Sequence, residues 1–320
     1  MQINQLGTSD MWLTRIGLGA WAIGGGNTIM SWGPQDDSAS IAAIHKAIDL
    51  GVNWIDTAPA YGLGHSEEIV GRAVKESAVK PFIFTKCGIV WDEKRELRRT
   101  LLEIRRELED SLRRLQVEVI DLYQIHWPPE DKGEDILDAW TTMAALQHEG
   151  KVRYIGLSNF PTVEIERCLE IARVTSLQPP YSMINRGVEA EIMPYCMEHN
   201  IGVINYAPMH SGLLTGAMSK ERVANMPSDD FRRTAKNYQE PLLSRNLAIA
   251  DFLKQIGARH NLSAGVIAIA WTIANPAIAA AIVGARSPEQ VEGVWPAAKF
   301  RLSPDEKKEI DAFLEAHPAP

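Results

Sequence analysis

The stretch NWIDTAPAYGLGHSEEIVGRAV, residues 53–74, decides the fold. A short apolar run ends at Asp56, the chain turns through Pro59 and Gly62, and a helix is expected to begin near Ser66. A serine followed by two glutamates is typical of a helix start. The serine side chain can accept a hydrogen bond from a free backbone N–H group at the helix start. The negative charges of the glutamates are stabilised by the positive end of the helix dipole. The stretch therefore predicts one strand–loop–helix unit.

The same unit recurs along the whole chain. Apolar runs alternate with segments whose apolar residues repeat every three or four positions, which is the spacing of an amphipathic helix. The expected strands lie within residues 13–21, 52–57, 81–86, 119–127, 152–160, 175–182, 201–209 and 277–286. The expected helices lie within residues 40–51, 66–77, 96–116, 136–150, 162–173, 192–200 and 287–298. Eight strands alternating with helices, without a linker, predict an α/β fold: a (β/α)8 TIM barrel formed by a single domain over residues 1–320.

Two segments depart from the repeat. Residues 3–15 are expected to form a β-hairpin that turns at Gly7–Asp10 and closes one end of the barrel. Residues 211–245 follow the seventh strand and are rich in Gly, Ser, Asp, Asn and Arg. They are too long for a simple connection, which predicts a functional loop.

The composition excludes several classes of function. A net charge of −8, with 45% hydrophobic and 23% charged residues, is typical of a globular protein and disfavours a nucleic-acid partner. No run of about 18 uncharged apolar residues is present, so no membrane partner is predicted. Cys87, Cys168 and Cys196 form neither a CxxC pair nor a metal-binding spacing, which favours a reduced, cytoplasmic location without a metal site. Rossmann and Walker motifs are missing.

Ionisable residues close three consecutive expected strands. These residues are Asp56, Lys86 and His126, and Tyr61 follows Asp56 on its loop. Each could be structural when taken alone, but the carboxyl ends of barrel strands share one mouth. A Lys86 ammonium would lower the phenol pKa of Tyr61, and Asp56 would keep that ammonium charged. The group suits delivery of a proton to a carbonyl oxygen, with His126 hydrogen-bonded to the substrate. A Schiff base on Lys86 is the alternative, which the nearby carboxylate disfavours.

Six blocks of the chain, in order, resemble the aldo-keto reductases, and in particular the bacterial branch similar to the potassium-channel β subunits. The blocks are IDTAPAYGLGHSEEIVG, FTK, IDLYQIHWP, GKVRYIGLSNF, NYAPMHSGLLTG and IVGARSPEQV. The resemblance implies a (β/α)8 barrel that binds NADPH or NADP+, with NADH less favoured, and that reduces aldehydes or ketones by hydride transfer. It places Tyr61 as general acid, with Asp56, Lys86 and His126 completing a catalytic tetrad.

The resemblance also implies a cofactor site, with residues 211–245 as a loop that covers it. Ser158, Asn159 and Gln178 would hold the nicotinamide carboxamide, and Tyr206 would stack on the nicotinamide ring. The remaining expected cofactor contacts are Ala207, Pro208, Ser211, Gly212, Leu213, Leu214, Gly216, Gly284, Arg286 and Gln290. Of these, Arg286 would hold the 2′-phosphate of NADPH. Gly293 and Val294 stand where many relatives carry Glu-Asn to grip the adenine. Arg232 and Arg233, on the covering loop, are further candidates for contact with phosphate or substrate.

Tryptophans mark the expected substrate pocket. Trp21, Trp32, Trp91 and Trp127 fall at expected strand ends or on the loops beyond them, where an indole offers an apolar face and one N–H. Such a pocket suits a small-molecule carbonyl substrate, either a sugar-like or an aromatic aldehyde. A nucleotide-sensing regulatory subunit with slow turnover is the alternative function on the same fold. The sequence predicts no particular oligomeric state.

Overall fold

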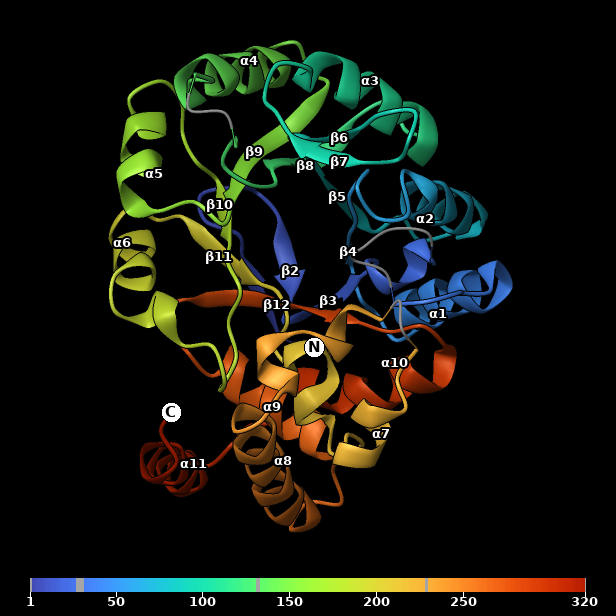
Figure 1. The fold of residues 1–320 in the computed structure, drawn as a ribbon. Helices are drawn as coiled ribbons and strands as arrows, with labels where there is room; N and C mark the ends of the chain where they lie inside the picture. Colours follow the sequence, from blue (N-terminus) through green and yellow to red (C-terminus); the bar gives the residue numbers. More distant parts are fainter. Residues whose placement is uncertain (1, 27–31, 131–132, 228–229, 320) are drawn as a thin grey trace.

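Parallel strands form a closed barrel at the centre of the protein (Figure 1). The structure is a computed structural model that describes residues 2–26, 32–130, 133–227 and 230–319. Within these residues the barrel strands follow one another in chain order: β3 (Ile16–Gly19), β4 (Trp54–Asp56), β5 (Phe82–Cys87), β8 (Ile120–Ile125), β9 (Val152–Ser158), β10 (Ser176–Gln178), β11 (Gly202–Asn205) and β12 (Ile278–Gly284). The pairing of β12 with β3 closes the ring. The predicted (β/α)8 barrel is confirmed.

Helices surround the strands and bury one face against them (Figure 1). In α2, Ile69, Val70 and Ala73 are buried whereas Glu68 and Arg72 are exposed, which is the pattern of an amphipathic surface helix. The α-helices are α1 (Asp37–Asp49), α2 (His65–Glu76), α3 (Ile104–Leu115), α4 (Ile136–His148), α5 (Thr162–Leu169), α6 (Ile192–Glu198), α7 (Lys220–Ala224), α8 (Leu242–Ala258), α9 (Ala264–Ile273), α10 (Pro288–Val294) and α11 (Pro304–Ala316). Among the described helices, none is long and apolar enough to cross a lipid bilayer.

The predicted amino-terminal hairpin is present and seals the barrel. It consists of β1 (Ile3–Gln5) and β2 (Trp12–Thr14), which pair in antiparallel register. The side chains of Leu6, Met11 and Leu13 are fully buried in a cluster inside the barrel that also holds Trp54 and Phe84. The indole N–H of Trp54 donates to the carbonyl oxygen of Thr14 at 2.9 Å, which fixes the hairpin to the strands. The hairpin therefore closes the end at which the strands begin.

The helix predicted over residues 96–116 is wrong at its start. Residues 89–99 form a second hairpin, β6 (Ile89–Trp91) paired with β7 (Leu97–Arg99), and α3 begins only at Ile104. The Asp92 carboxylate accepts hydrogen bonds from the backbone N–H groups of Lys94 and Glu96, and Arg95 has a φ of 65°. These features make a tight turn, which overrides the helical spacing of the leucines.

The long segment after β11 is folded and has a small core of its own. Its short helices are η3 (His210–Thr215), α7, η4 (Phe231–Arg233) and η5 (Lys236–Tyr238). Its buried side chains are Leu213, Met218, Val223, Met226, Tyr238 and Leu243. Residues 228 and 229 lie outside the described residues. The segment packs against α8 and α9, so it is held in a defined position beside the barrel mouth.

Candidate active site

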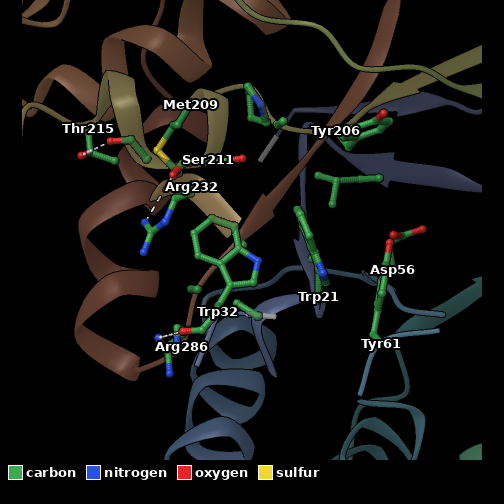
Figure 2. A pocket seen from close by; sticks show the side chains of 18 of the residues that line it. Trp21, Trp32, Asp56, Tyr61, Tyr206, Met209, Ser211, Thr215, Arg232 and Arg286 are labelled. Atoms are coloured by element: carbon green, nitrogen blue, oxygen red, sulfur yellow. Dashed lines mark hydrogen bonds between the residues drawn. The ribbon is translucent and has the colours of Figure 1, made fainter. Parts of the chain in front are cut away.

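A cavity of about 650 Å³ opens where the barrel strands end. It runs from Asp56 and Tyr61 on one side to Arg232 and Arg286 on the other (Figure 2). Barrel enzymes carry out their chemistry at this end of the strands. The volume lies in the range of small-molecule and cofactor sites.

Lys86 is the centre of a buried polar cluster on one wall of this cavity. Its Nζ lies 2.6 Å from Asp56 Oδ1, 2.9 Å from the carbonyl oxygen of Thr57 and 3.3 Å from Tyr61 Oη. The Lys86 and Asp56 residues are 0% and 2% exposed. A buried charge of this kind is tolerated only when it is paired and hydrogen-bonded. The structure thus brings three of the four predicted catalytic side chains into one hydrogen-bonded chain.

The loop that carries Tyr61 is fixed by close backbone contacts. Gly62 has a φ of 63°, and a Cβ atom there would lie 2.0 Å from the carbonyl oxygen of Gly24. The hydroxyl of Ser66 donates to the carbonyl oxygen of Ala20 at 2.8 Å, so the start of α2 is tied to the end of β3. The glycine in the opening sequence is therefore required by the turn that brings Tyr61 to Lys86.

The prediction that Lys86 lowers the phenol pKa of Tyr61 is wrong. Burial raises the pKa of Tyr61 well above its ordinary value, and the negative charge of Asp56 raises it further. Burial also lowers the pKa of Lys86, while the ion pair with Asp56 opposes that change. Removal from water disfavours the phenolate more than the ammonium favours it. Tyr61 therefore keeps its proton at neutral pH.

His126 lies beside the Tyr61 ring. The two ring centroids are 5.8 Å apart, in an edge-to-face arrangement with an interplanar angle of 82°. Burial lowers the pKa of His126 well below its ordinary value, and the charges of Lys86 and Arg99 lower it further. The imidazole is therefore neutral at neutral pH. A neutral ring can hydrogen-bond a substrate oxygen without adding a charge to the site.

The four residues predicted around the nicotinamide lie together beside this cluster. The Ser158 hydroxyl donates to the carbonyl oxygen of Gln178 at 2.8 Å, and Tyr206 Oη donates to Asn159 Oδ1 at 2.9 Å. Asn159, Gln178 and Tyr206 line the cavity, whereas Ser158 is fully buried behind them. Gln178 Oε1 accepts no hydrogen bond from another described side chain or backbone group. An oxygen of this kind at a cavity wall fits an amide N–H donor such as a carboxamide.

The segment after β11 turns its backbone sharply along the cavity. Ala207, Ser211 and Gly212 have φ values of 56°, 52° and 98°, and all three line the cavity together with Pro208. Left-handed turns can direct backbone N–H groups towards an anion, although the N–H of Gly212 itself donates to the carbonyl oxygen of Met209 at 3.2 Å. Leu213 and Leu214 are fully buried, and Gly216 ends η3 with a φ of 81°. Leu213, Leu214 and Gly216 do not line the cavity, so their side chains do not contact a group bound there.

The far end of the cavity carries Arg286. Its guanidinium donates to Gln35 Oε1 at 2.5 Å, to the carbonyl oxygen of Trp32 at 3.3 Å and to that of Pro34. Its backbone N–H donates to Gln290 Oε1 at 2.9 Å. All the acceptors of the guanidinium are neutral. The positive charge of Arg286 therefore has no carboxylate bonded to it among the described residues.

The cavity wall at this end also includes uncharged positions. Gly284, Gln290, Gly293 and Val294 all contribute to the wall. A Cβ atom at Gly293 would meet nothing within 4 Å, so the space beside α10 is open where relatives are expected to carry a polar side chain.

Trp21 and Trp32 line the cavity and pack against Phe231, which does not line it. The Phe231 ring lies 5.3 Å from that of Trp21 and 5.4 Å from that of Trp32, and these two indoles are 5.3 Å apart, edge to face. The Arg232 guanidinium lies 4.5 Å from the Trp32 ring and pairs with Asp230. Figure 2 shows Trp21 and Trp32 between Tyr61 and the two arginines. The segment after β11 thus meets the loop after β3 across the cavity.

Trp127 lines the cavity as predicted, whereas Trp91 and Arg233 do not. Trp127 lines the cavity, with the Arg99 guanidinium 4.6 Å from its ring. Trp91 lies on β6 outside the cavity wall, and its ring faces Arg114 at 5.9 Å, so its predicted role in the pocket is corrected. The guanidinium of Arg233 donates to the carbonyl oxygen of Met226 at 3.4 Å, and this residue does not line the cavity.

Sequence reasoning missed three residues in or next to the site: Ser263, which lines the cavity, and Gln124 and Phe231, which lie behind its wall. Gln124 stands two positions before His126, and alternate residues of a strand share a face, so this signal was available. Ser263 caps α9 and lines the cavity with Gly265, which places the positive end of a ten-residue helix at the cavity wall. Phe231 stands in a segment without periodicity, and nothing local in the sequence indicates its contact with Trp21.

The barrel and this constellation define an aldo/keto reductase. Residues 15–315 match the aldo/keto reductase family, and the chain belongs to that family of oxidoreductases. Members use a nicotinamide cofactor, and the left-handed turns, the α9 terminus and Gln178 fit such a group here.

Three similar proteins cover almost the whole chain. The aldo-keto reductase YhdN of Bacillus subtilis (strain 168) is 35% identical over 98% of this chain and 94% of its own length. The NADH-specific methylglyoxal reductase of Escherichia coli (strain K12) is 34% identical over 93% and 94%. The structure of the glycerol dehydrogenase AKR11B4 from Gluconobacter oxydans superposes with a TM-score of 0.90, at 39% identity over 100% and 97% of the two chains.

Proposed function

We propose that the protein is an NADPH-dependent reductase that converts small aldehydes or ketones to alcohols. The observation that carries this proposal is the hydrogen-bonded chain from Asp56 through Lys86 to a protonated Tyr61 on the cavity wall. A protonated phenol beside an ammonium can give its proton to an oxygen on which negative charge develops. The ion pair at 2.6 Å also disfavours Schiff-base chemistry, because Asp56 keeps the Lys86 amine protonated.

The side chains then have separate tasks. The nicotinamide, when bound, supplies the hydride. Tyr61 Oη donates its proton to the substrate oxygen, and the Lys86 ammonium, 3.3 Å away, stabilises the phenolate that remains. His126, as a neutral ring, hydrogen-bonds the same substrate oxygen and orients it. Asp56 keeps Lys86 charged and in place throughout.

Cofactor binding is assigned to the same residues that the resemblance implied. Asn159 and Gln178 would hold the carboxamide, Tyr206 would support the ring, and the backbone around Ser211 and Gly212 would bind the pyrophosphate. The Arg286 guanidinium, which has no hydrogen-bonded carboxylate among the described residues, supports a 2′-phosphate contact at the far end of the cavity, and so NADPH over NADH.

The substrate is proposed to be a small carbonyl compound, sugar-like or aromatic, held between Trp21, Trp32 and Trp127. Relatives named for methylglyoxal and glycerol support a small oxygenated compound. The family match over residues 15–315 and the hairpin buried in the barrel support a single domain. The buried free thiols of Cys87, Cys168 and Cys196 support a cytoplasmic location.

Replacement of Tyr61 tests the proposal. Tyr61→Phe should reduce turnover by at least about 10²-fold while leaving the Kd for NADPH unchanged, because only proton delivery is removed. Steady-state oxidation of NADPH over a panel of carbonyl substrates gives the first quantity, and fluorescence titration gives the second. Tyr195→Phe is the matched control, because that hydroxyl makes no hydrogen bond to a described residue and lies outside the cavity. Full activity of Tyr61→Phe would refute the role, whereas tight NADPH binding by the wild type without turnover of any substrate would indicate the nucleotide-sensing function.

A further inference from the structure

Gln124 occupies the interior of the barrel directly beneath the proposed active site. It lies on β8 in register with Lys86 on β5 and with Gly156 on β9, and Gly156 is in turn in register with Ser176 on β10. The Gln124 side chain is fully buried and does not line the cavity. It can therefore influence a bound cofactor only through its neighbours.

Gln124 and Asp56 together fix the orientation of the Gln178 amide. Gln178 Nε2 donates to Asp56 Oδ2 at 2.9 Å and to Gln124 Oε1 at 3.4 Å. An ionised carboxylate only accepts hydrogen bonds, so Asp56 requires the nitrogen of Gln178 on its side. The second N–H of the same nitrogen then needs an acceptor, which Gln124 provides. Because both N–H groups are bonded to Asp56 and Gln124, Gln178 turns its Oε1 towards the cavity.

This arrangement leaves one polar atom of Gln124 without a partner. Its Nε2 is buried and makes no hydrogen bond to any described group, and the same is true of Ser176 Oγ. The interior residues next to this level, Leu122 and Ile204, are apolar. An apolar side chain at position 124 would avoid the cost of burying an unbonded N–H. Barrel stability alone therefore does not explain a glutamine here.

We propose that Gln124 is a positioning residue, which holds the Gln178 amide so that Oε1 accepts the N–H of the nicotinamide carboxamide. The inference rests on the proposed function, because it needs a nicotinamide in the cavity. According to this inference, Gln124 makes the site prefer a carboxamide to a group of the same shape that cannot donate a hydrogen bond. Through Asp56, it also joins carboxamide binding to the side chains that deliver the proton.

The experiment compares the binding of two cofactors to the full-length protein. The probes are NADP+ and its 3-acetylpyridine analogue, whose acetyl group has no N–H. Binding is measured by calorimetry, which does not depend on turnover. Wild type should bind NADP+ on the order of 10-fold more tightly than the analogue, the ratio expected for one hydrogen bond. In Gln124→Met this ratio should fall to about 2 or below, with no loss in melting temperature.

Two further variants separate positioning from packing. In Gln124→Glu, burial and the nearby Asp56 charge would keep the new carboxyl protonated, so its carbonyl oxygen still accepts from Gln178 and most of the preference for NADP+ should be retained. Ser176→Ala removes a neighbouring hydroxyl that does not contact Gln178 and should bind both probes as wild type does. An unchanged ratio in Gln124→Met, an equal weakening of both probes, or the absence of any preference in wild type would overturn the inference. Failure of the proposed function would look different, since wild type would then bind neither probe.

Discussion

Asp56 uses its two carboxylate oxygens for two different parts of the site. Oδ1 accepts from Lys86 at 2.6 Å and Oδ2 accepts from Gln178 at 2.9 Å. One side chain thus fixes both the group next to the proton donor and the amide next to the proposed nicotinamide position. Removal of Asp56 would leave the Lys86 charge buried without a partner, which is strongly destabilising. Conservative changes at Tyr61 and Gln124 are therefore cleaner probes than changes at Asp56.

At the far end of the cavity, Arg286 gives a test of cofactor choice. Arg286→Ala should raise the Kd for NADPH on the order of 10- to 100-fold and that for NADH much less, because only NADPH has a 2′-phosphate to form charge-assisted hydrogen bonds. Calorimetric titration of both cofactors checks this. Arg233→Ala is the control, because its guanidinium contacts the carbonyl oxygen of Met226 outside the cavity. Equal losses for both cofactors would mean that Arg286 only holds the loop of Trp32.

The proposed catalytic side chains could be located from the sequence, but their electrostatics could not. Asp56, Lys86 and His126 each close an apolar run, so position alone brings them to one rim. The direction of the Tyr61 pKa depends on the balance between burial and the charge of Lys86, and burial is a property of the folded site. The same holds for Gln124, whose role follows from contacts across three strands.

Among the elements, the hairpin of β6 and β7 shows where periodicity misleads. Leu97 and Leu101 follow the spacing of the α3 leucines, yet Leu97 pairs with Trp91 across the hairpin. Ile89 and Leu97 line the cavity, so this hairpin contributes to the cavity wall. A short polar turn at Asp92 outweighs helix propensity, which is a weak preference for each residue.

The η4 helix should control how long a cofactor stays bound, because Phe231 joins the covering segment to Trp21 and Trp32. Phe231→Ala should increase the dissociation rate of NADPH by about 5- to 150-fold, given the energies typical of two aromatic contacts. Stopped-flow fluorescence measures this rate. Lys236→Ala, an exposed change on the same segment, should leave it unaltered. A Phe231→Ala rate equal to that of wild type would show that the aromatic contacts do not retain the cofactor.

For the molecule as a whole, the order of strands was the most predictable property. Each strand–helix unit is local in sequence, and successive parallel strands joined by helices wind in one direction. Eight such strand–helix units predict a closed barrel, so its closure follows from the number of units in the sequence. By contrast, the packing of residues 211–245 depends on contacts with α8 and α9 that are distant in sequence, so only its length could be read as functional.

The stability of the fold should depend on pH through Glu107, a buried carboxylate of α3. It accepts from the backbone N–H of Gly88 at 3.0 Å, and burial raises its pKa from 4.5 to about 7. The folded state therefore favours the protonated form. The resulting stability is fully present below pH 4.5 and is lost as the pH rises through about 7.

Glu107→Gln should flatten that dependence, since the amide cannot ionise but still offers an oxygen to Gly88. The free energy of unfolding of wild type should fall between pH 5 and pH 8 by up to about 3 kcal/mol more than that of the variant. Urea denaturation at several pH values measures this. Glu109→Gln, on the exposed side of the same helix, serves as control. Parallel curves for wild type and Glu107→Gln would contradict the assignment.

The amino-terminal hairpin determines which end of the barrel is closed and which end is open. Because β1 and β2 close the end where the strands begin, this hairpin and the cavity lie at opposite ends of the barrel. A support or carrier protein attached at the amino end would leave the entrance free. The protein could thus be immobilised in a single orientation, with every active site open to the solution.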